Sequence, residues 1–347
     1  MIYEQEKKIA VVGGGVAGMQ AANVLGRLGY QVTLFEKAEQ LGGNVRNWSN
    51  LFPHHEKAND VVSRLQAMLI THDNIKVLTS SPIDNVDVDG HKVVLTLPDR
   101  QEDFDAVILA SGFEPFDATK KEEYGYGVFD HVVTSVDFEF AEKNGTINKL
   151  VPTNKSKIGF VHCVGSRDEK VCNEYCSKAC CITAVKQAIE VKKLNPEAEV
   201  YCFYMDLRLF DRHFEAMYKE AQEKWGVQFI RGRLSEVNED RHSKLVVRVE
   251  DTLSRRPMKL SLDLLVLMVG MVPSVGTEHF AETLNLKSFD DKFIQEDGHV
   301  LTAQNMDVRK GIFVAGTAKG PSTVKETIAD AKSVAINVHF YIKHMLQ

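Results

Sequence analysis

One stretch of the sequence, residues 8–36, constrains the fold more than any other. It reads KIAVVGGGVAGMQAANVLGRLGYQVTLFE: an apolar run, a glycine turn, a helix pattern rich in small residues, and a second apolar run that ends before Glu36. The glycines follow the spacing G-x-G-x-x-G, at Gly13, Gly15 and Gly18. Strand, turn, helix and strand in this order form the dinucleotide-binding fingerprint. We therefore expect an α/β fold with a Rossmann-type domain that binds a dinucleotide.

The fingerprint gives each glycine a separate task. Gly13 permits a tight turn, and Gly15 lets a pyrophosphate approach the backbone at the helix N-terminus. Gly18 permits close packing of the helix on the strand, and Glu36, 18 positions later, is placed to accept hydrogen bonds from ribose hydroxyls. The residues of this stretch that we expect to bind the dinucleotide are Gly13, Gly15, Val16, Ala17, Gly18, Glu36 and Lys37.

Two further segments indicate which dinucleotide is bound. DAVILASGFEP (105–115) is a buried strand that runs into a glycine, and GIFVAGTAKGPSTVKETIADAKSVA (311–335) is a strand, a glycine turn and a helix. In this order and spacing the three segments resemble the two-dinucleotide-fold flavoproteins, the thioredoxin- and glutathione-reductase-like class. The resemblance implies FAD, with its pyrophosphate at the first segment and its ribityl chain and flavin at the last. The further candidate FAD contacts are Ala110, Ser111, Gly112, Gly316, Thr317, Thr323 and Val324.

The last segment departs from that class at one position. Thr317 stands where the class usually has an acidic residue, so we expect backbone amides and hydroxyls to hold the ribityl chain. Residues 41–53, LGGNVRNWSNLFP, form a loop in which Gly43 allows the main chain to pass close to a ligand. Asn44 and Arg46 are candidate donors to FAD in this loop, and a loop with a surface arginine is an equal alternative.

Five of the six cysteines fall within CVGSRDEKVCNEYCSKACC, residues 163–181. The segment lies between an apolar strand pattern (157–165) and an amphipathic helix pattern (182–194), and a further strand pattern (199–206) follows. A two-fold flavoprotein has its nicotinamide-binding glycine loop at this place, and only Gly165 remains of it here. A turn with side chains at nearly every position cannot admit a pyrophosphate onto its backbone. We therefore expect that the usual nicotinamide site is lost.

The composition excludes several classes of protein. The formal net charge of −6 argues against a nucleic-acid surface, which needs a basic face. The most apolar window, LDLLVLMVGMVP (262–273), is far shorter than the roughly 20 residues that span a bilayer. The N-terminal residues show no signal-peptide pattern, so we expect a cytoplasmic location, where thiols stay reduced.

Several chemistries compete for the cysteines. Disulfides are disfavoured by the reducing compartment, and a catalytic dithiol would need C-x-x-C, whereas Cys172, Cys176 and Cys180 are spaced as C-x-x-x-C. Zinc commonly uses paired knuckles with a longer spacer between them. Four thiolates beside a flavin domain favour an iron–sulfur cluster, which would have an electron partner there. Zinc and buried thiols without a metal remain open on spacing alone.

At the level of whole motifs the chain resembles the A subunit of heterodisulfide reductase and its bacterial relatives. The resemblance rests on CVGSRD…YCSKACC, FYMDLRLF, YKEAQEKWGVQFIRGRLSEV and GIFVAGTAKGP, and it covers nearly the whole chain. It implies a thioredoxin-reductase-like domain with FAD and one [4Fe–4S] cluster. The cluster ligands that it implies are Cys163, Cys176, Cys180 and Cys181. Cys172 has no counterpart in the family pattern, and we expect Cys202 in the core.

The resemblance also implies a function. The chain lacks the ferredoxin-like cysteine runs of the large methanogen members, so it looks more like the compact A subunits of sulfur-oxidising heterodisulfide-reductase-like complexes or of quinone-interacting complexes. We expect an oxidoreductase subunit in which FAD and the cluster exchange electrons with B- and C-type partner subunits, on a homodimeric platform and with no catalytic side chain. The alternatives are a stand-alone NAD(P)H-dependent thiol or polysulfide reductase and a zinc-containing scaffold.

The expected domain division is discontinuous. Residues 1–117 and 285–347 are assigned to the FAD-binding domain, and 118–284 to a central module that resembles a nicotinamide domain and carries the cysteines. We read residues 117–156, which lack long periodicity, as the crossing between the two. Three charged residues of the MDLRLFD segment, Asp206, Arg208 and Asp211, are read as a surface of ion pairs or a docking edge, and His162 as structural or exposed.

Overall fold

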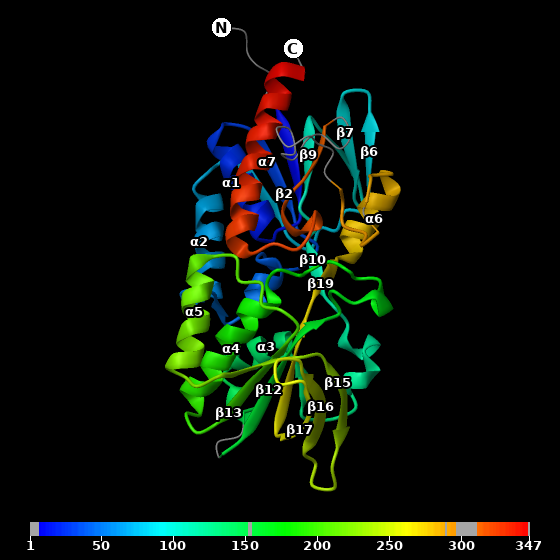
Figure 1. The fold of residues 1–347 in the computed structure, drawn as a ribbon. Helices are drawn as coiled ribbons and strands as arrows, with labels where there is room; N and C mark the ends of the chain where they lie inside the picture. The colour runs from blue at the N-terminus through cyan, green and yellow to red at the C-terminus, as the bar shows by residue number, and fades with distance from the viewer. Residues whose placement is uncertain (1–6, 152–154, 289, 296–310, 346–347) are drawn as a thin grey trace. The chain divides into compact units, whose positions relative to one another are not determined.

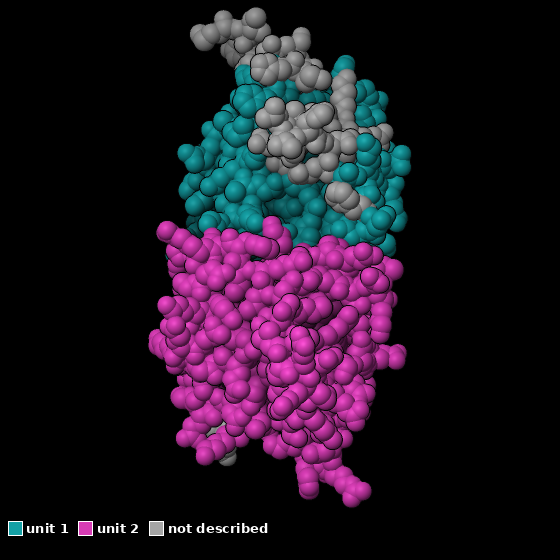
Figure 2. All heavy atoms as spheres, viewed as in Figure 1, with its two compact units in different colours: residues 1–46, 58–114, 272–347 teal, residues 47–57, 115–271 magenta. Residues whose placement is uncertain are grey.

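The computed structural model describes residues 7–151, 155–288, 290–295 and 311–345. The chain divides into two compact units, which Figure 2 distinguishes by colour. The first unit comprises residues 1–46, 58–114 and 272–347, and the second comprises 47–57 and 115–271. Each unit is built on its own parallel sheet.

These boundaries differ from the expected ones. The return crossing lies at 271/272 and not at 284/285, because helix α6 (Val275–Thr283) belongs to the first unit. Thr277 on α6 bonds Ser111 at 2.7 Å and donates to the carbonyl oxygen of Gly112 at 2.8 Å. Residues 47–57 join the second unit, where Lys186 donates to the carbonyl oxygen of Asn50 at 2.7 Å.

The first unit has a five-stranded parallel sheet in the order β20-β9-β1-β2-β5. Its strands are β1 (Lys8–Val12), β2 (Gln31–Phe35), β5 (Ile75–Leu78), β9 (Ala106–Leu109) and β20 (Ile312–Val314). The helices α1 (Val16–Arg27), α2 (Ala58–Ile70) and α7 (Val324–Met345) pack side by side, with α1 between the other two (Figure 1). Strand order reverses at β1, as in a doubly wound Rossmann sheet.

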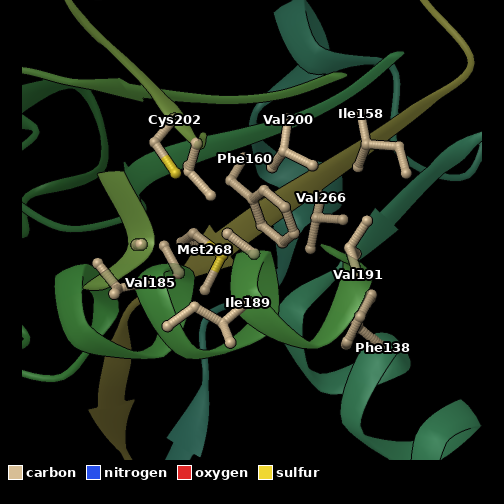
Figure 3. Packing of buried hydrophobic residues seen from close by; sticks show 14 of the residues in the cluster. Phe138, Ile158, Phe160, Val185, Ile189, Val191, Val200, Cys202, Val266 and Met268 are labelled. Carbon is tan, nitrogen blue, oxygen red and sulfur yellow. The ribbon is translucent and has the colours of Figure 1, made fainter. Parts of the chain in front are cut away.

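The second unit repeats this order. Its parallel sheet runs β11-β18-β12-β13-β14, so that strand order reverses at β12. The strands are β11 (Val132–Thr134), β12 (Lys157–Val164), β13 (Glu199–Tyr204), β14 (Gln228–Arg231) and β18 (Leu264–Val269). Helix α4 (Cys180–Leu194) packs its apolar face on β12, β13 and β18, with Val185 and Ile189 directed at Phe160 and Met268 (Figure 3).

Residues 117–156 contain more regular structure than the sequence indicated. They include β11, at the edge of the second sheet, and helix α3 (Ser135–Lys143). A capping box begins α3: the Thr134 hydroxyl accepts the N–H of Asp137, and the Asp137 carboxylate accepts the N–H of Thr134. The sequence contains the T-x-x-D pattern that marks the start of this helix. A helix of only nine residues, however, shows too little periodicity to be predicted.

Smaller elements complete the two units. Antiparallel three-stranded sheets are formed by β6 (Asn85–Asp89), β7 (Lys92–Thr96) and β8 (Gln101–Phe104), and by β15 (Leu234–Glu239), β16 (Leu245–Asp251) and β17 (Arg256–Leu262). Two-stranded pairs are formed by β3 (Asn50–Leu51) with β4 (Glu56–Lys57), and by β10 (Phe113–Pro115) with β19 (Met271–Pro273). Helix α5 (Arg212–Glu223) follows β13. Within the described ranges, no helix has both the length and the apolar character needed to cross a bilayer.

Candidate functional site

The turn between β1 and α1 combines tightly packed glycines with one open position. A Cβ at Gly13, whose φ is +111°, would lie 2.3 Å from the carbonyl oxygen of Ala110, and a Cβ at Gly18 would lie 1.8 Å from the carbonyl oxygen of Gly13. These two positions exclude any side chain for reasons of packing. At Gly15, by contrast, a Cβ would meet nothing nearer than Gly43 Cα at 4.0 Å.

Gly15 is the N-cap of α1, with extended backbone at φ −72° and ψ −174°. The first N–H groups of a helix have no partner within the helix, so those of Val16 and Ala17 are donors for an anion at this end. The first turn of α1 contains no acidic side chain that would repel an anion. The open backbone and the helix N-terminus together fit a pyrophosphate.

Glu36 is fixed beside this turn by main-chain donors. One carboxylate oxygen accepts the N–H of Gly14 at 2.7 Å, and the other accepts the N–H of Ala38 at 2.8 Å. The side chain is buried, whereas Lys37 is exposed. Each carboxylate oxygen can accept a second hydrogen bond, so the oriented carboxylate retains acceptor capacity for ribose hydroxyls.

The remaining candidate residues of the first unit approach this turn through close contacts. A Cβ at Gly43 would lie 3.2 Å from Gly15 Cα. A Cβ at Gly316 would lie 2.7 Å from Ala17 Cβ, and a Cβ at Gly112 would lie 3.6 Å from Thr317 Oγ1. Thr323 and Val324 lie at the start of α7, where the Thr323 hydroxyl accepts the N–H of Glu326 at 3.2 Å. The segments singled out from the sequence are therefore neighbours in one unit.

Two predicted donors are engaged within their own unit. The Asn44 amide donates to the carbonyl oxygen of Phe113 at 2.7 Å, and the Arg46 guanidinium donates to the carbonyl oxygen of Gln40 at 2.7 Å.

A carboxylate that the sequence reasoning missed lies at the last glycine turn. Asp330 of α7 accepts the N–H of Gly316 at 2.6 Å and pairs with Lys319 at 2.5 Å.

The cysteines lie at the corresponding turn of the second unit, between β12 and α4. The Cys163 and Cys180 sulfurs are 4.0 Å apart and buried, and Cys181, also buried, lies 3.9 Å from the carbonyl oxygen of Asp206. Cys176 lies in the turn, half-buried, and accepts the N–H of Lys178 at 3.4 Å. The end of β12 and the first turn of α4 thus bring three of the four predicted ligands together, with the fourth in the turn that joins them.

The other two cysteines have different surroundings. Cys172 is exposed, in a left-handed conformation at φ +57°. Cys202 is fully buried in β13 and packs among Val200, Phe160 and Met268 in the apolar core (Figure 3). All six cysteines are free thiols.

The clustered thiols polarise one another. Hydrogen bonding with Cys180 is the largest cause that lowers the pKa of Cys163 to about 7 and that of Cys181 to about 4, while the same interactions and burial raise the pKa of Cys180. One thiol therefore retains its proton between two neighbours that favour the thiolate form. The thiolate is the form in which cysteine binds metals.

Side-chain contacts fill the turn from residue 165 to 179. The buried Asp168 carboxylate accepts hydrogen bonds from Lys121 at 2.6 Å and Arg233 at 2.9 Å. Arg167 pairs with Asp206, and Tyr175 donates to the carbonyl oxygen of Met271 at 2.7 Å. A Cβ at Gly165 would lie 2.0 Å from the ring of Phe116. The glycine that remains from a dinucleotide loop is therefore covered by an aromatic side chain.

The MDLRLFD segment beside these cysteines is partly neutralised. Asp206 pairs with Arg167 and also lies 3.7 Å from Arg208, while Asp211 caps α5 by accepting the N–H of His213 at 2.9 Å.

His162, which the sequence reasoning treated as structural or exposed, is buried on β12. Burial acts to lower its pKa, but the sulfurs of Cys181 and Cys202 raise it overall to about 10.

A buried ionic network in the second unit was not found from the sequence. Lys186 of α4 pairs with Glu139 of α3 and donates to the carbonyl oxygen of Asn50, and the oxygens of Glu139, Glu142 and Glu190 lie within 4.8 Å of one another. Burial, with Glu190 and Glu139 nearby, raises the pKa of Glu142 to about 7. In the sequence, this network was indicated only by the i, i+4 spacing of Lys186 and Glu190 within the apolar pattern of a helix.

Comparisons with known proteins agree with this architecture. The model of the pyridine nucleotide-disulphide oxidoreductase family matches residues 7–161. Thioredoxin reductase from Lactococcus lactis superposes with a TM-score of 0.66 over 97% of this chain and 99% of its own, at 17% identity. A thioredoxin reductase from T. acidophilum superposes with a TM-score of 0.67 over 98% of this chain and 100% of its own, at 14% identity. The expected thioredoxin-reductase-like fold is confirmed.

The relatives in sequence are more specific. The iron-sulfur A subunit of CoB–CoM heterodisulfide reductase from Methanocaldococcus jannaschii is 32% identical over 96% of this chain. The chain is a homologue of the A subunits of heterodisulfide reductase. The A subunit of the H2/formate-dependent CoB–CoM heterodisulfide, ferredoxin reductase from Methanococcus maripaludis is 31% identical over the same share. The chain spans 64% of the length of each of these two relatives. The family resemblance drawn from the cysteine segment is confirmed.

Proposed function

We propose that this chain is an oxidoreductase subunit that binds FAD in the first unit and one [4Fe–4S] cluster in the second, and passes electrons between them and partner subunits. When bound, FAD exchanges electrons in pairs and the cluster exchanges them singly. The chain itself supplies binding, orientation and electrostatic tuning, and no side chain acts as nucleophile or general acid.

The first unit supports the flavin part of the proposal. The open backbone at Gly15, the N-terminus of α1 and the oriented Glu36 carboxylate provide a pyrophosphate site and a ribose site on adjacent elements. Gly13 and Gly18 keep strand and helix close enough for this geometry. Asp330 stabilises the glycine turn at the other segment, where Thr317 replaces the usual acid.

The cysteine turn supports the cluster part, and one observation carries it: three buried cysteines converge where the sheet order reverses. Ligands of doubly wound sheets bind at this edge, and thiolates are the donors of iron–sulfur clusters. The ligands we propose are Cys163, Cys176, Cys180 and Cys181, while Cys172 is exposed and Cys202 lies in the core.

Further support for a cluster over a single zinc ion comes from the relatives. The A subunit from Methanocaldococcus jannaschii, 32% identical over 96% of this chain, is named an iron-sulfur subunit. Four cysteine thiolates are the ligand set of a [4Fe–4S] cluster, and the proposed set has four members.

The partners we propose follow from the relatives. In those proteins the A subunit is part of a named multi-subunit reductase, so B- and C-type subunits are the proposed electron partners here. We further propose that the complex is of the sulfur-oxidising heterodisulfide-reductase-like type, and that a symmetric homodimer forms its platform. Light scattering of the purified chain, alone and with co-expressed partner subunits, tests both assemblies.

Stopped-flow spectroscopy separates this function from a stand-alone NAD(P)H-dependent reductase. We expect excess NADH or NADPH to leave the flavin absorbance of the anaerobic protein unchanged over seconds, because Phe116 and the turn side chains cover the backbone that would bind pyrophosphate. Dithionite should bleach both chromophores. Saturable reduction by NADH faster than about 10 s⁻¹, a typical turnover rate, would contradict the proposal.

A further inference from the structure

The histidine on the cysteine side of β12 belongs to neither of the proposed ligand sets. His162 is 6% exposed, and neither of its ring nitrogens has a hydrogen-bond partner within the described ranges. Buried polar atoms in folded proteins are almost always paired, and a group without a partner needs an explanation. Phe160, two residues earlier on β12, packs in the same buried cluster as helix α4, so His162 is directed toward that helix, whose first turn carries Cys181. A cysteine sulfur of α4 is therefore the acceptor that its position offers.

The backbone around His162 is shaped to aim two successive side chains at the cysteines of α4. Successive residues of a strand normally point to opposite faces. Here the pairing of β12 with β18 slips between Val161 and Val164, and Cys163 adopts a left-handed conformation at φ +60°. Cys163 consequently meets Cys180, although His162, its neighbour in the strand, is directed toward the same helix. A bulge with a strained non-glycine residue of this kind commonly re-aims side chains at functional sites.

We infer that His162 is a positioning residue that donates an N–H hydrogen bond to the Cys181 thiolate when that thiolate ligates the cluster, and thereby raises the reduction potential of the cluster. The inference rests on the proposed cluster. It extends that proposal by naming a residue that tunes the cluster without ligating it.

Cys181 is a better acceptor for His162 than Cys202 is. Cys202 lies in the apolar core among Val200, Phe160 and Met268 and is not one of the proposed ligands (Figure 3). A ligating thiolate is charged and accepts a stronger hydrogen bond. The ring of Tyr204 also lies 6.4 Å from that of His162, centroid to centroid.

The expected effect follows from the charge on sulfur. Reduction adds negative charge to the cluster and its thiolates, so an N–H donor stabilises the reduced form more than the oxidised form. Loss of the donor should lower the ratio of reduced to oxidised cluster at a fixed potential by about tenfold, which corresponds to ~59 mV for one electron.

The test is a redox titration of the anaerobic protein followed by electron paramagnetic resonance. His162→Leu should shift the cluster midpoint to lower potential by about the amount given above, while His162→Gln, which retains an N–H donor, should keep most of the wild-type value. Cys202→Ala, which changes the other neighbour of His162, is the control and should leave the midpoint unchanged. Equal midpoints for wild type and His162→Leu would overturn the inference.

A measurement on the unmodified protein covers the case in which His162→Leu fails to assemble a cluster. Wild-type protein labelled with 15N-histidine should show a weak 15N coupling to the reduced cluster in pulsed resonance spectra, and His162→Gln should lose it. Absence of the coupling in a protein that contains iron and sulfide would overturn the role of His162 alone. Absence of iron and sulfide from the wild type would instead overturn the proposed cluster.

Discussion

The turns after β1 and after β12 occupy the same place in two sheets of the same strand order, yet they differ in almost every physical respect. The first consists of residues 13–15, all glycine, and leaves open backbone at Gly15. The second extends from 165 to 179 and is filled by ionic and aromatic side chains. Topology fixes where a ligand binds, and the side chains of the turn decide which ligand that is.

The two turns also offer a ligand different groups. In the first unit these are main-chain N–H groups at the N-terminus of α1, together with the Glu36 carboxylate, which two further N–H groups hold in place. In the second unit they are cysteine sulfurs, held by a bulge in β12 and by the first turn of α4. Main-chain donors suit phosphate, whereas thiolates suit iron.

The largest expected effect comes from removing a sulfur from the second turn. Replacement of Cys163, Cys176, Cys180 or Cys181 by Ala should reduce the iron content from about four per chain to near zero, because a cubane cluster needs all four ligands. Cys172→Ala is the matched control from the same turn and should retain the cluster. Iron and sulfide assays on anaerobically purified variants decide the assignment, and a cluster kept without Cys163 but lost without Cys172 would refute it.

The next effect concerns the open position of the first turn. Gly15→Val should remove FAD while the protein still folds, because Gly15 has ordinary extended dihedral angles and a Cβ there would meet nothing nearer than Gly43 Cα at 4.0 Å. The valine side chain would instead occupy the proposed pyrophosphate site. Flavin absorbance per chain is the measurement, with Gly15→Ala as a smaller step in the same direction. Full flavin content in Gly15→Val would show that the pyrophosphate lies elsewhere.

A smaller effect is expected at Glu36. Glu36→Ala should weaken FAD binding by roughly 10- to 100-fold, since hydrogen bonds to a charged group contribute about 1.5–3 kcal/mol. Glu36→Gln keeps an acceptor oxygen and should lose less. Titration of the flavin-free protein with FAD measures both variants, together with their melting temperatures, because the carboxylate also accepts the N–H groups of Gly14 and Ala38. Unchanged affinity in Glu36→Ala would place the ribose away from this strand end.

The smallest effect is a pH dependence that belongs to the second unit alone. The pKa of Glu142 is raised to about 7, so the folded chain retains a proton that the unfolded chain releases. This contribution to stability is fully present below the unfolded pKa of about 4.3 and is lost as the pH rises through about 7. Glu142→Gln should flatten the decline in unfolding free energy between pH 5 and 8. Parallel denaturant curves for wild type and variant over this range would contradict the assignment.

The sequence predicted the elements with strong periodicity and missed those defined by packing. The glycine fingerprint located β1, α1 and β2, because the spacing has few other physical uses. The nine-residue α3 was missed, since so short a helix shows little periodicity. The domain boundary near 285 was misplaced because α6 joins the first unit through hydroxyl contacts between residues 166 positions apart.

The candidate site shows the same division between features that have a local sequence pattern and features that depend on packing. The family resemblance named the four thiols, and three of them converge. The role that we propose for His162 depends on a register slip in β12, and the network around Lys186 depends on contacts among α3, α4 and residues 47–57. Neither has a local sequence signature, because both arise from residues that only the folded sheet brings together.

The main difference that we propose between the two turns is that the second one binds iron and sulfide, whereas the first binds a dinucleotide. Elemental analysis of the anaerobically purified wild-type chain, with acid-labile sulfide measured on the same sample, tests this. We expect about four iron atoms and four sulfides per chain, with zinc near zero. One zinc per chain without sulfide, or no metal at all in a protein that contains its flavin, would contradict the proposed cluster.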